Sequence, residues 1–309
     1  VYAGRNWLHL PDHLPQGVYV LLTHRPGDYP IAANAQTPQP EPLVIAWDDA
    51  GQQDDITAYL RRQAERPEIH RALAEATPPI AVEQFVIELQ MAAEGNFKYL
   101  DYVLADIAAR EVGFDPLDMQ GLPRGLRGYY AHFWAQMEQV KGQEGWAEWK
   151  GLYRPVIELL GVAGEPVTAE WLADHTGREA DEIEERALAR WVRFLRCERR
   201  IEGARTWRII HRSFSDFLAE KVDLPAAHRR VAKYYLDAWG GCEAGLPHLD
   251  TTSELHNGYG LRHLVSHLAA AGDKTILWSL LVETPTWRKA QEMYDPSLTQ
   301  YACLLYTSD

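Results

Sequence analysis

Arg25 is the residue best placed to bind an anion. It follows the run 17–23, GVYVLLT, closely, and that run predicts a buried parallel strand because its apolar residues fall on both faces. Open α/β sheets bind ligands at the carboxyl ends of such strands. A guanidinium is always charged and can hold two phosphate oxygens. Arg25 is therefore a candidate phosphate ligand, and the alternative is an arginine that closes a local ion pair.

His211 is a second candidate for an anion contact. It ends a predicted strand and stands just before Ser213, which can cap the helix that follows. An imidazole can donate a hydrogen bond to an anion without a fixed full charge, so the contact can be released. The alternative is a histidine whose hydrogen bonds are satisfied inside the core.

A metal site is not expected at the histidine pair His263 and His267. The two lie four residues apart on a predicted helix, but HLVSH lacks the glutamate of the HExxH motif and no acidic partner is placed. Ordinary surface or core histidines are expected instead. No GxSxG motif occurs and no cysteine has a convincing histidine partner, so no catalytic nucleophile is predicted.

Length and composition predict a protein of two or three small domains. The chain has 309 residues, 46% hydrophobic and 24% charged, with a net charge of -13. The negative charge argues against a general nucleic-acid binder. Three cysteines without CxxC spacing suggest a reducing, cytoplasmic setting without structural zinc. No apolar run approaches the roughly 20 residues of a membrane helix.

The first third of the chain predicts part of an α/β sheet. Runs 17–23 and 43–47 predict buried strands, and an amphipathic helix is expected over 54–66. Pro78-Pro79 predicts a boundary. A long parallel strand needs neighbours on both sides, and the first 16 residues supply none. We therefore expect the sheet to continue upstream of Val1.

Helices dominate the remainder. The stripe Phe97, Leu100, Val103, Leu104 and Ile107 predicts a buried helix face, and Pro123 is expected to begin a helix. Over 150–221 we expect helix, short extended stretch, helix, a long helix over 181–196, a hairpin around Gly203, and a closing helix. Three helices followed by a two-stranded wing describe a winged helix. Tryptophans at helical spacing are expected in core and interdomain contacts: Trp134, Trp146, Trp149, Trp171, Trp191, Trp239, Trp278 and Trp287.

Four segments in this order carry a family resemblance: GVYVLLTHRP, EGNFKYLDYVL, LPRGLRGYYAHFW and WRIIHRSFSDFLAEK. Over roughly residues 1–270 the chain resembles NACHT-type STAND ATPases of bacteria. The resemblance implies a mainly α fold with a small α/β remnant. The domains it implies are the C-terminal part of a P-loop NTPase core (1–78), a helical domain (79–145), a winged helix (146–224) and a helical linker domain (225–302). Residues 303–309, CLLYTSD, resemble a translated sequencing adapter.

The resemblance also implies roles for three residues. Arg25 matches the sensor arginine that faces the γ-phosphate, His211 the winged-helix histidine that touches the β-phosphate of ADP, and Gly95 the helix start that approaches the adenine. The phosphate loop GxxxxGK[ST] and the acidic Walker-B strand are absent from the sequence. We therefore expect no ATP hydrolysis by this piece. ADP or ATP with Mg belongs to the intact parent, expected to be an ATPase, and should not bind tightly here.

The resulting hypothesis is a nucleotide-sensing, autoinhibitory half of a signalling switch, closed with ADP and open with ATP. Family analogy adds self-association through the NTPase module, a protein trigger sensed by C-terminal repeats, and an output in defence or cell death. One alternative is a winged-helix DNA-binding regulator, although its reader helix would begin with the acidic stretch GREADEIEERA. The other is an interaction scaffold without a nucleotide role, favoured if Arg25, Gly95 and His211 share no cleft.

Overall fold

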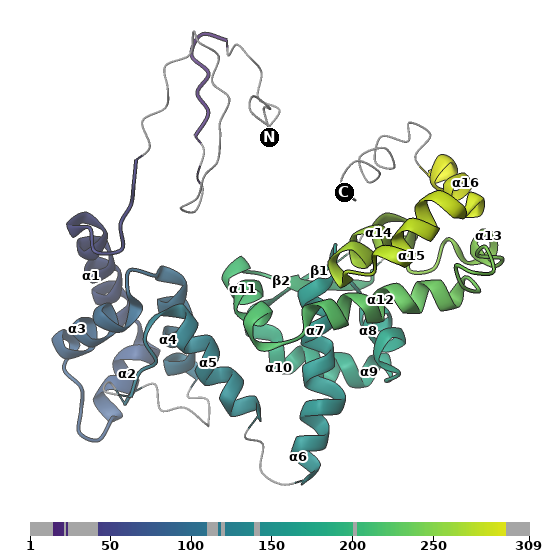
Figure 1. Ribbon diagram of the computed structural model, residues 1–309. Helices are drawn as coiled ribbons and strands as arrows, with labels where there is room; N and C mark the ends of the chain where they lie inside the picture. The colour runs from purple at the N-terminus through teal and green to yellow at the C-terminus, as the bar shows by residue number, and fades with distance from the viewer. Residues whose placement is uncertain are drawn as a thin grey trace.

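A computed structural model describes residues 15–21, 23, 43–109, 117–118, 121–138, 143–199 and 203–294. Within these ranges the protein is mainly helical and has one two-stranded antiparallel sheet. Three successive parts follow one another from left to right in Figure 1. We call them the helical segment (50–138), the wing module (143–221) and the C-terminal helices (224–294). Arg25 and residues 303–309 lie outside the described residues.

The helical segment contains α1 (Ala50–Ala64), α2 (Pro67–Glu75), α3 (Val82–Ala93), α4 (Phe97–Ala109) and α5 (Gly125–Glu138). The Asp49 carboxylate caps α1 by accepting from the Gln52 N–H at 3.3 Å. The predicted stripe on α4 is buried from Leu100 to Ile107, while Phe97 stays partly exposed. Helix α1 packs against α3, and α2 packs against α4. The helices before and after Pro78-Pro79 therefore share one core.

The two predicted N-terminal strands are not strands in the structure. No strand is assigned at residues 17–21, 23 or 43–47. The apolar side chains there are exposed, with Tyr19 and Leu21 each 91% accessible and Leu43 89%. A strand needs a hydrogen-bonded neighbour, and the sheet among the described residues is formed by β1 and β2, without either of these runs. The described part of the protein therefore does not bury these two apolar runs.

The wing module follows the predicted order of elements. Its helices and strands are α6 (Gln143–Glu148), η1 (Trp149–Tyr153), α7 (Arg154–Val162), α8 (Ala169–Thr176), α9 (Ala180–Glu182), η2 (Ile183–Leu188), α10 (Ala189–Trp191), η3 (Val192–Phe194), β1 (Leu195–Arg199), β2 (Arg205–Ile209) and α11 (Arg212–Lys221). The elements α6–η1–α7 and α9–η2–α10–η3 are each one continuous helical stretch. Val167, between α7 and α8, pairs with Trp207 of β2. The Val167 N–H donates to the Trp207 carbonyl at 3.0 Å, and the Trp207 N–H donates to the Val167 carbonyl at 2.7 Å. The hairpin thus gains a short third antiparallel partner.

The predicted long helix ends earlier than expected. The pattern predicts helix over 181–196, but β1 already begins at Leu195, opposite Ile209. The Ile210 N–H donates to the Phe194 carbonyl at 3.0 Å and fixes the helix end beside the strand. The apolar pattern continues across the junction, so periodicity alone did not locate it.

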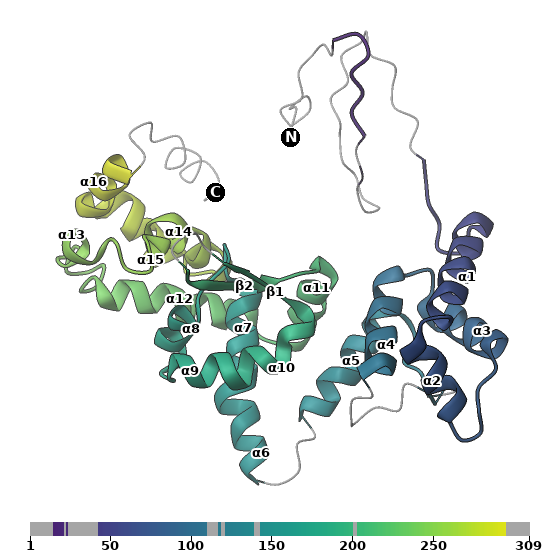
Figure 2. The same cartoon turned by 180° about the vertical axis from the view of Figure 1, so that it is seen from behind.

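The C-terminal helices comprise α12 (Leu224–Ala238), α13 (Leu249–Thr252), α14 (Tyr259–Ala271), α15 (Lys274–Trp278), η4 (Ser279–Glu283) and α16 (Pro285–Tyr294). Asp223 caps α12 by accepting from the Ala226 N–H at 2.9 Å. Helix α12 packs on α14 and also on α7, so this part is joined to the wing module, as Figure 2 shows from behind. Of the helices described, none is long and apolar enough to cross a membrane.

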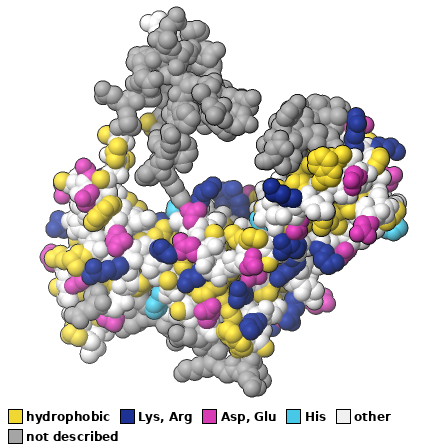
Figure 3. Space-filling view, viewed as in Figure 1, with side chains coloured by type: hydrophobic (Ala, Val, Ile, Leu, Met, Phe, Trp, Pro, Cys, Tyr) yellow, Lys and Arg dark blue, Asp and Glu magenta, His cyan; other side chains and the backbone are white. Residues whose placement is uncertain are grey.

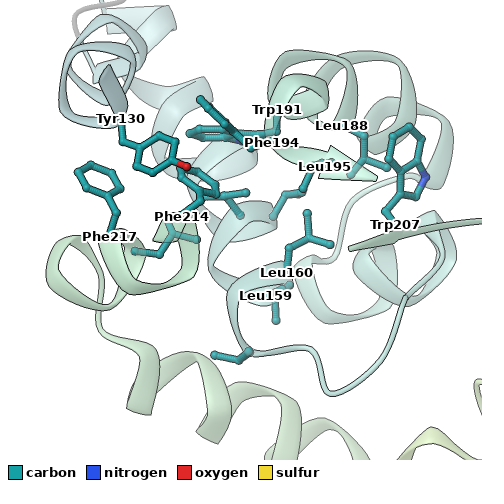
Figure 4. Close-up of a cluster of buried hydrophobic side chains, with 14 of the residues drawn as sticks. Tyr130, Leu159, Leu160, Leu188, Trp191, Phe194, Leu195, Trp207, Phe214 and Phe217 are labelled. Atoms are coloured by element: carbon teal, nitrogen blue, oxygen red, sulfur yellow. The ribbon is translucent and has the colours of Figure 1, made fainter. Parts of the chain in front are cut away.

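Aromatic side chains fill the contact between the helical segment and the wing module. Figure 4 shows Tyr130 of α5 facing Phe214 and Phe217 of α11, beside Trp191 and Phe194. The rings of Phe194 and Phe214 stack with centroids 4.3 Å apart. The expected role of the tryptophans is confirmed for those in this list, which are nearly or fully buried: Trp134, Trp149, Trp171, Trp191, Trp239 and Trp287. It is wrong for Trp146 and Trp278, which are exposed.

Candidate functional site

Gly95 lies in the turn between α3 and α4 with a φ of 76°. A Cβ at this position would stand 2.7 Å from the Trp47 Cβ and 2.8 Å from the Trp47 carbonyl oxygen. The Gly95 carbonyl also accepts from the Gln52 side chain at 3.0 Å. The missing side chain does permit a close approach, as expected. The group that approaches in this structure is Trp47 of the same chain.

His211 lies in a different part, at the start of α11. We expected Ser213 to cap this helix, but His211 is the capping residue. Its Nδ1 accepts from the Ser213 N–H at 3.3 Å and stands 2.5 Å from the Ser213 hydroxyl. With Nδ1 as an acceptor, the neutral ring carries its proton on Nε2. A phosphate contact would therefore have to come from the Nε2–H group.

Ser213 extends this arrangement to the helical segment. Its hydroxyl oxygen lies 3.0 Å from the Tyr130 hydroxyl of α5. Because the Ser213 hydroxyl donates to His211 Nδ1, Tyr130 donates to the Ser213 oxygen in the consistent arrangement. The cap of α11 is thereby connected to α5 by two successive hydrogen bonds.

A second set of polar residues also joins the wing module to the helical segment. Arg193 Nη1 donates to Asp106 Oδ1 and to the Tyr129 hydroxyl oxygen, each at 2.7 Å. Tyr129 donates to Asp106 Oδ2, also at 2.7 Å. Burial, together with the nearby Asp106 charge, raises the pKa of Tyr129. We call this group and the His211–Ser213–Tyr130 chain the α5 junction.

Sequence reasoning missed most of the α5 junction. Asp106 lies in the helix with the predicted apolar stripe and Arg193 in the helix predicted over 181–196, and neither was a candidate site residue. One signal was available: Asp106 stands three residues after Val103, at the edge of the face that the stripe buries. A carboxylate at such a position needs a partner. The identity of that partner, 87 residues away, could not be read from the sequence.

The arginines of the third wing-module helix contact the rest of the protein. Arg186 pairs with Glu148 of α6 and with Glu182, and the Arg190 Nε–H donates to Met137 Sδ of α5 at 3.1 Å. On the neighbouring hairpin, Arg205 pairs with Glu184 at 2.6 Å. Figure 3 shows basic and acidic side chains interspersed over the visible face rather than sorted by sign.

The histidine pair His263 and His267 is engaged in other contacts. His263 Nε2 lies 3.3 Å from Glu165, and His267 is bonded to Tyr259 and His228. Within the described ranges, no group of three or more potential metal ligands comes together.

The α5 junction is thus a set of polar contacts between two parts of the protein, with one imidazole at its edge. It brings His211 to the helical segment, whereas Gly95 lies in a different turn and Arg25 falls outside the described residues. No protein-family model, curated protein or solved structure matches the chain.

Proposed function

We propose that the chain is the nucleotide-sensing and autoinhibitory half of a STAND-type switch. The wing module is a winged helix in this proposal, and the α5 junction holds it in the closed state. The element order supports the winged helix: helix, extended bridge at Val167, two further helical stretches, hairpin and closing helix. The sequence resemblance supports the class.

One observation carries the proposal: His211 caps α11 and is connected through Ser213 to Tyr130 of α5. His211, to which the resemblance assigns a hydrogen bond to ADP, thus lies where the wing module meets the helical segment. A change at the imidazole alters the cap and, with it, the hydrogen bond to α5. Nucleotide state and domain contact can be coupled through this short route.

The charge distribution disfavours the DNA-binding alternative. A reader helix has to present basic side chains to phosphates and bases. Here Arg186, Arg190 and Arg193 contact α6, α5 and α4 of the same chain. A DNA-reading function would require these contacts to break first.

The nucleotide contacts of the proposal are limited to His211 and Arg25. Gly95 is left out of the proposed contacts, because Trp47 lies where its side chain would be. The remaining expectations rest on the resemblance: binding of ADP or ATP with Mg, self-association through an NTPase module, and activation by a protein trigger.

The test is ADP binding by the full-length gene product, measured by calorimetry. The variant His211→Asn keeps an acceptor in the place of Nδ1 and a residue favoured at helix caps, but it has no group in the place of Nε2. We expect ADP affinity to fall about tenfold or more, as for a lost hydrogen bond to a charged group. The matched control is His70→Asn, at an exposed position of α2, which should bind as the wild type does. Equal affinity of the two variants, or no ADP binding by the wild type, would overturn the proposal.

A further inference from the structure

Four histidines lie where the C-terminal helices meet the wing module. His175 is on α8, His228 on α12, His256 just before α14, and His267 on α14. We call this contact the histidine joint. It is separate from the α5 junction, which lies between the wing module and the helical segment.

One hydrogen-bond chain crosses the joint through His256. The indole N–H of Trp171 on α8 donates to the Tyr235 hydroxyl at 3.0 Å. The Tyr235 oxygen lies 2.8 Å from His256 Nδ1, and His256 Nε2 lies 3.0 Å from Asp174 Oδ2. The indole can only donate and the carboxylate can only accept. The arrangement is satisfied when Tyr235 donates to Nδ1 and a neutral His256 donates from Nε2.

A second chain crosses the joint through His267. The Gly164 N–H donates to the Tyr259 hydroxyl at 3.0 Å, and that oxygen lies 3.0 Å from His267 Nε2. On the other side of the ring, His267 Nδ1 and His228 Nδ1 are 2.8 Å apart. If Tyr259 donates to Nε2, His267 donates from Nδ1 to His228, and every group is satisfied with both rings neutral.

Protonation of His228 or His267 breaks the hydrogen-bond pattern of the second chain. Two rings that face each other through Nδ1 have room for one proton between them, so protonating both would place two N–H groups head-on. Protonating His228 alone reverses the chain and leaves the Tyr259 hydroxyl with no acceptor among the contacts named above. His267 is only 2% exposed, so water cannot replace the lost bond.

His175 is equally unsuited to a positive charge. Its ring stacks on Trp171 with centroids 4.1 Å apart and lies 4.3 Å from the ring of Tyr234. Nδ1 donates to the Trp171 carbonyl at 2.7 Å, which leaves Nε2 as a buried nitrogen without a hydrogen-bond partner in the described structure. A proton on Nε2 would be a buried cationic donor with no acceptor. Burial lowers the pKa of His175 to about 4 and that of His267 to about 3, and also lowers that of His228.

Some charged groups around the joint favour the protonated form of a nearby histidine, and others oppose it. They are Glu158 of α7, Glu165 before α8, Glu170 and Asp174 of α8, Arg230 of α12, and Arg262 and His263 of α14. Burial lowers the pKa of His256, and the Asp174 carboxylate, 3.0 Å from its Nε2, opposes that shift. His256 and Arg230 oppose a charge on His175, and His228 and His263 oppose one on His267.

We propose that the histidine joint is a proton-sensitive contact, closed while His175, His228 and His267 are neutral and released in mild acid. Release would free the C-terminal helices from the wing module without disturbing the α5 junction. The inference does not depend on nucleotide binding.

Hydrogen exchange of the full chain at pH 7.5 and 5.5, corrected for intrinsic rates, tests the proposal. An open state whose histidines titrate near 6.5 gains about tenfold in population at pH 5.5 for each histidine kept neutral in the closed state. We expect protection of α8 and α14 to fall about tenfold or more relative to α3 and α4. A parallel change in all four helices would overturn the proposal.

A variant pair assigns the effect to the joint. His228→Asn keeps an acceptor facing His267 but cannot take up a proton, and should reduce the pH-dependent loss of protection severalfold. His70→Asn at the exposed control position should leave the loss unchanged. If His228→Asn does not fold, His175→Phe, which keeps an aromatic ring on Trp171, is the second variant. A full pH effect in a folded variant of either kind would contradict the proposed role of that histidine.

Discussion

Arg193 Nη1 lies 2.7 Å from Asp106 Oδ1, and this contact links the end of the third wing-module helix to α4. Both side chains are largely buried, and Tyr129 hydrogen-bonds to each of them. The pair is therefore central to the contact between the helical segment and the wing module. Its energetic weight can be measured.

Replacing Asp106 with Ala should destabilise the protein by about 3 kcal/mol, because Arg193 would keep a largely buried charge without its carboxylate. The double variant Asp106→Ala with Arg193→Ala should cost less than the sum of the single variants. Urea unfolding followed by tryptophan fluorescence measures all three. Additive costs would show that the two residues act independently.

Gly95→Ala should destabilise more than Gly177→Ala. Both glycines have positive φ, 76° and 68°, so both substitutions strain the backbone by about 1 kcal/mol. Only at Gly95 does the added Cβ also collide with another residue, Trp47, whereas nothing lies within 4 Å at Gly177. We expect an additional cost of about 1 to 3 kcal/mol at Gly95. Equal midpoints of thermal unfolding for the two variants would refute the close approach.

Tyr130→Phe should lower the free energy of unfolding by about 1 kcal/mol by removing the hydrogen bond to Ser213. The control is Tyr59→Phe, since Tyr59 bonds Asp101 at an exposed site and should contribute little. Chemical denaturation of both variants gives the comparison. Tyr130→Phe and His211→Ala should also be less than additive, because both interrupt the same chain. An unchanged free energy of unfolding in Tyr130→Phe would contradict the proposed hydrogen-bonded connection between α11 and α5.

Stability should fall between pH 7.5 and 5.5. His175 and His267 have pKa values of about 4 and about 3 in the folded protein, lowered chiefly by burial. The unfolded chain takes up these protons first, near pH 6.5, so folding stability is complete above that pH and declines as the pH falls toward the folded values. The expected loss at pH 5.5 is roughly 1.4 kcal/mol for each of the two histidines. Urea unfolding at both pH values measures it, and a constant midpoint would contradict the buried neutral state.

The parts of the fold that depend on local pattern were predictable. Leu100, Val103, Leu104 and Ile107 recur at helical spacing and are buried on one face of α4, and the hairpin around Gly203 follows from its turn residue. The N-terminal strands were not predictable in the same way. A run such as 17–23 shows that a segment is apolar and β-prone, but strand formation requires a partner that the run itself does not name.

The candidate site was only partly accessible from sequence. His211 stood out because it precedes a helix start, and the structure places it at the cap of α11. Its connection to Tyr130 spans residues far apart in the chain, and no local pattern encodes that distance. Gly95 was recognised as a position of close approach, yet the partner Trp47 could be identified only from the packed structure.

The most direct test of the proposed switch is the distance between the helical segment and the wing module, measured with ADP and with an ATP analogue. Spin labels at Met91→Cys on α3 and Glu179→Cys before α9 occupy exposed positions, in a background with the native cysteines replaced by serine. Pulsed electron paramagnetic resonance of the full-length gene product should give one short distance with ADP and a longer population with a non-hydrolysable ATP analogue. The same distance distribution with both nucleotides would contradict the account.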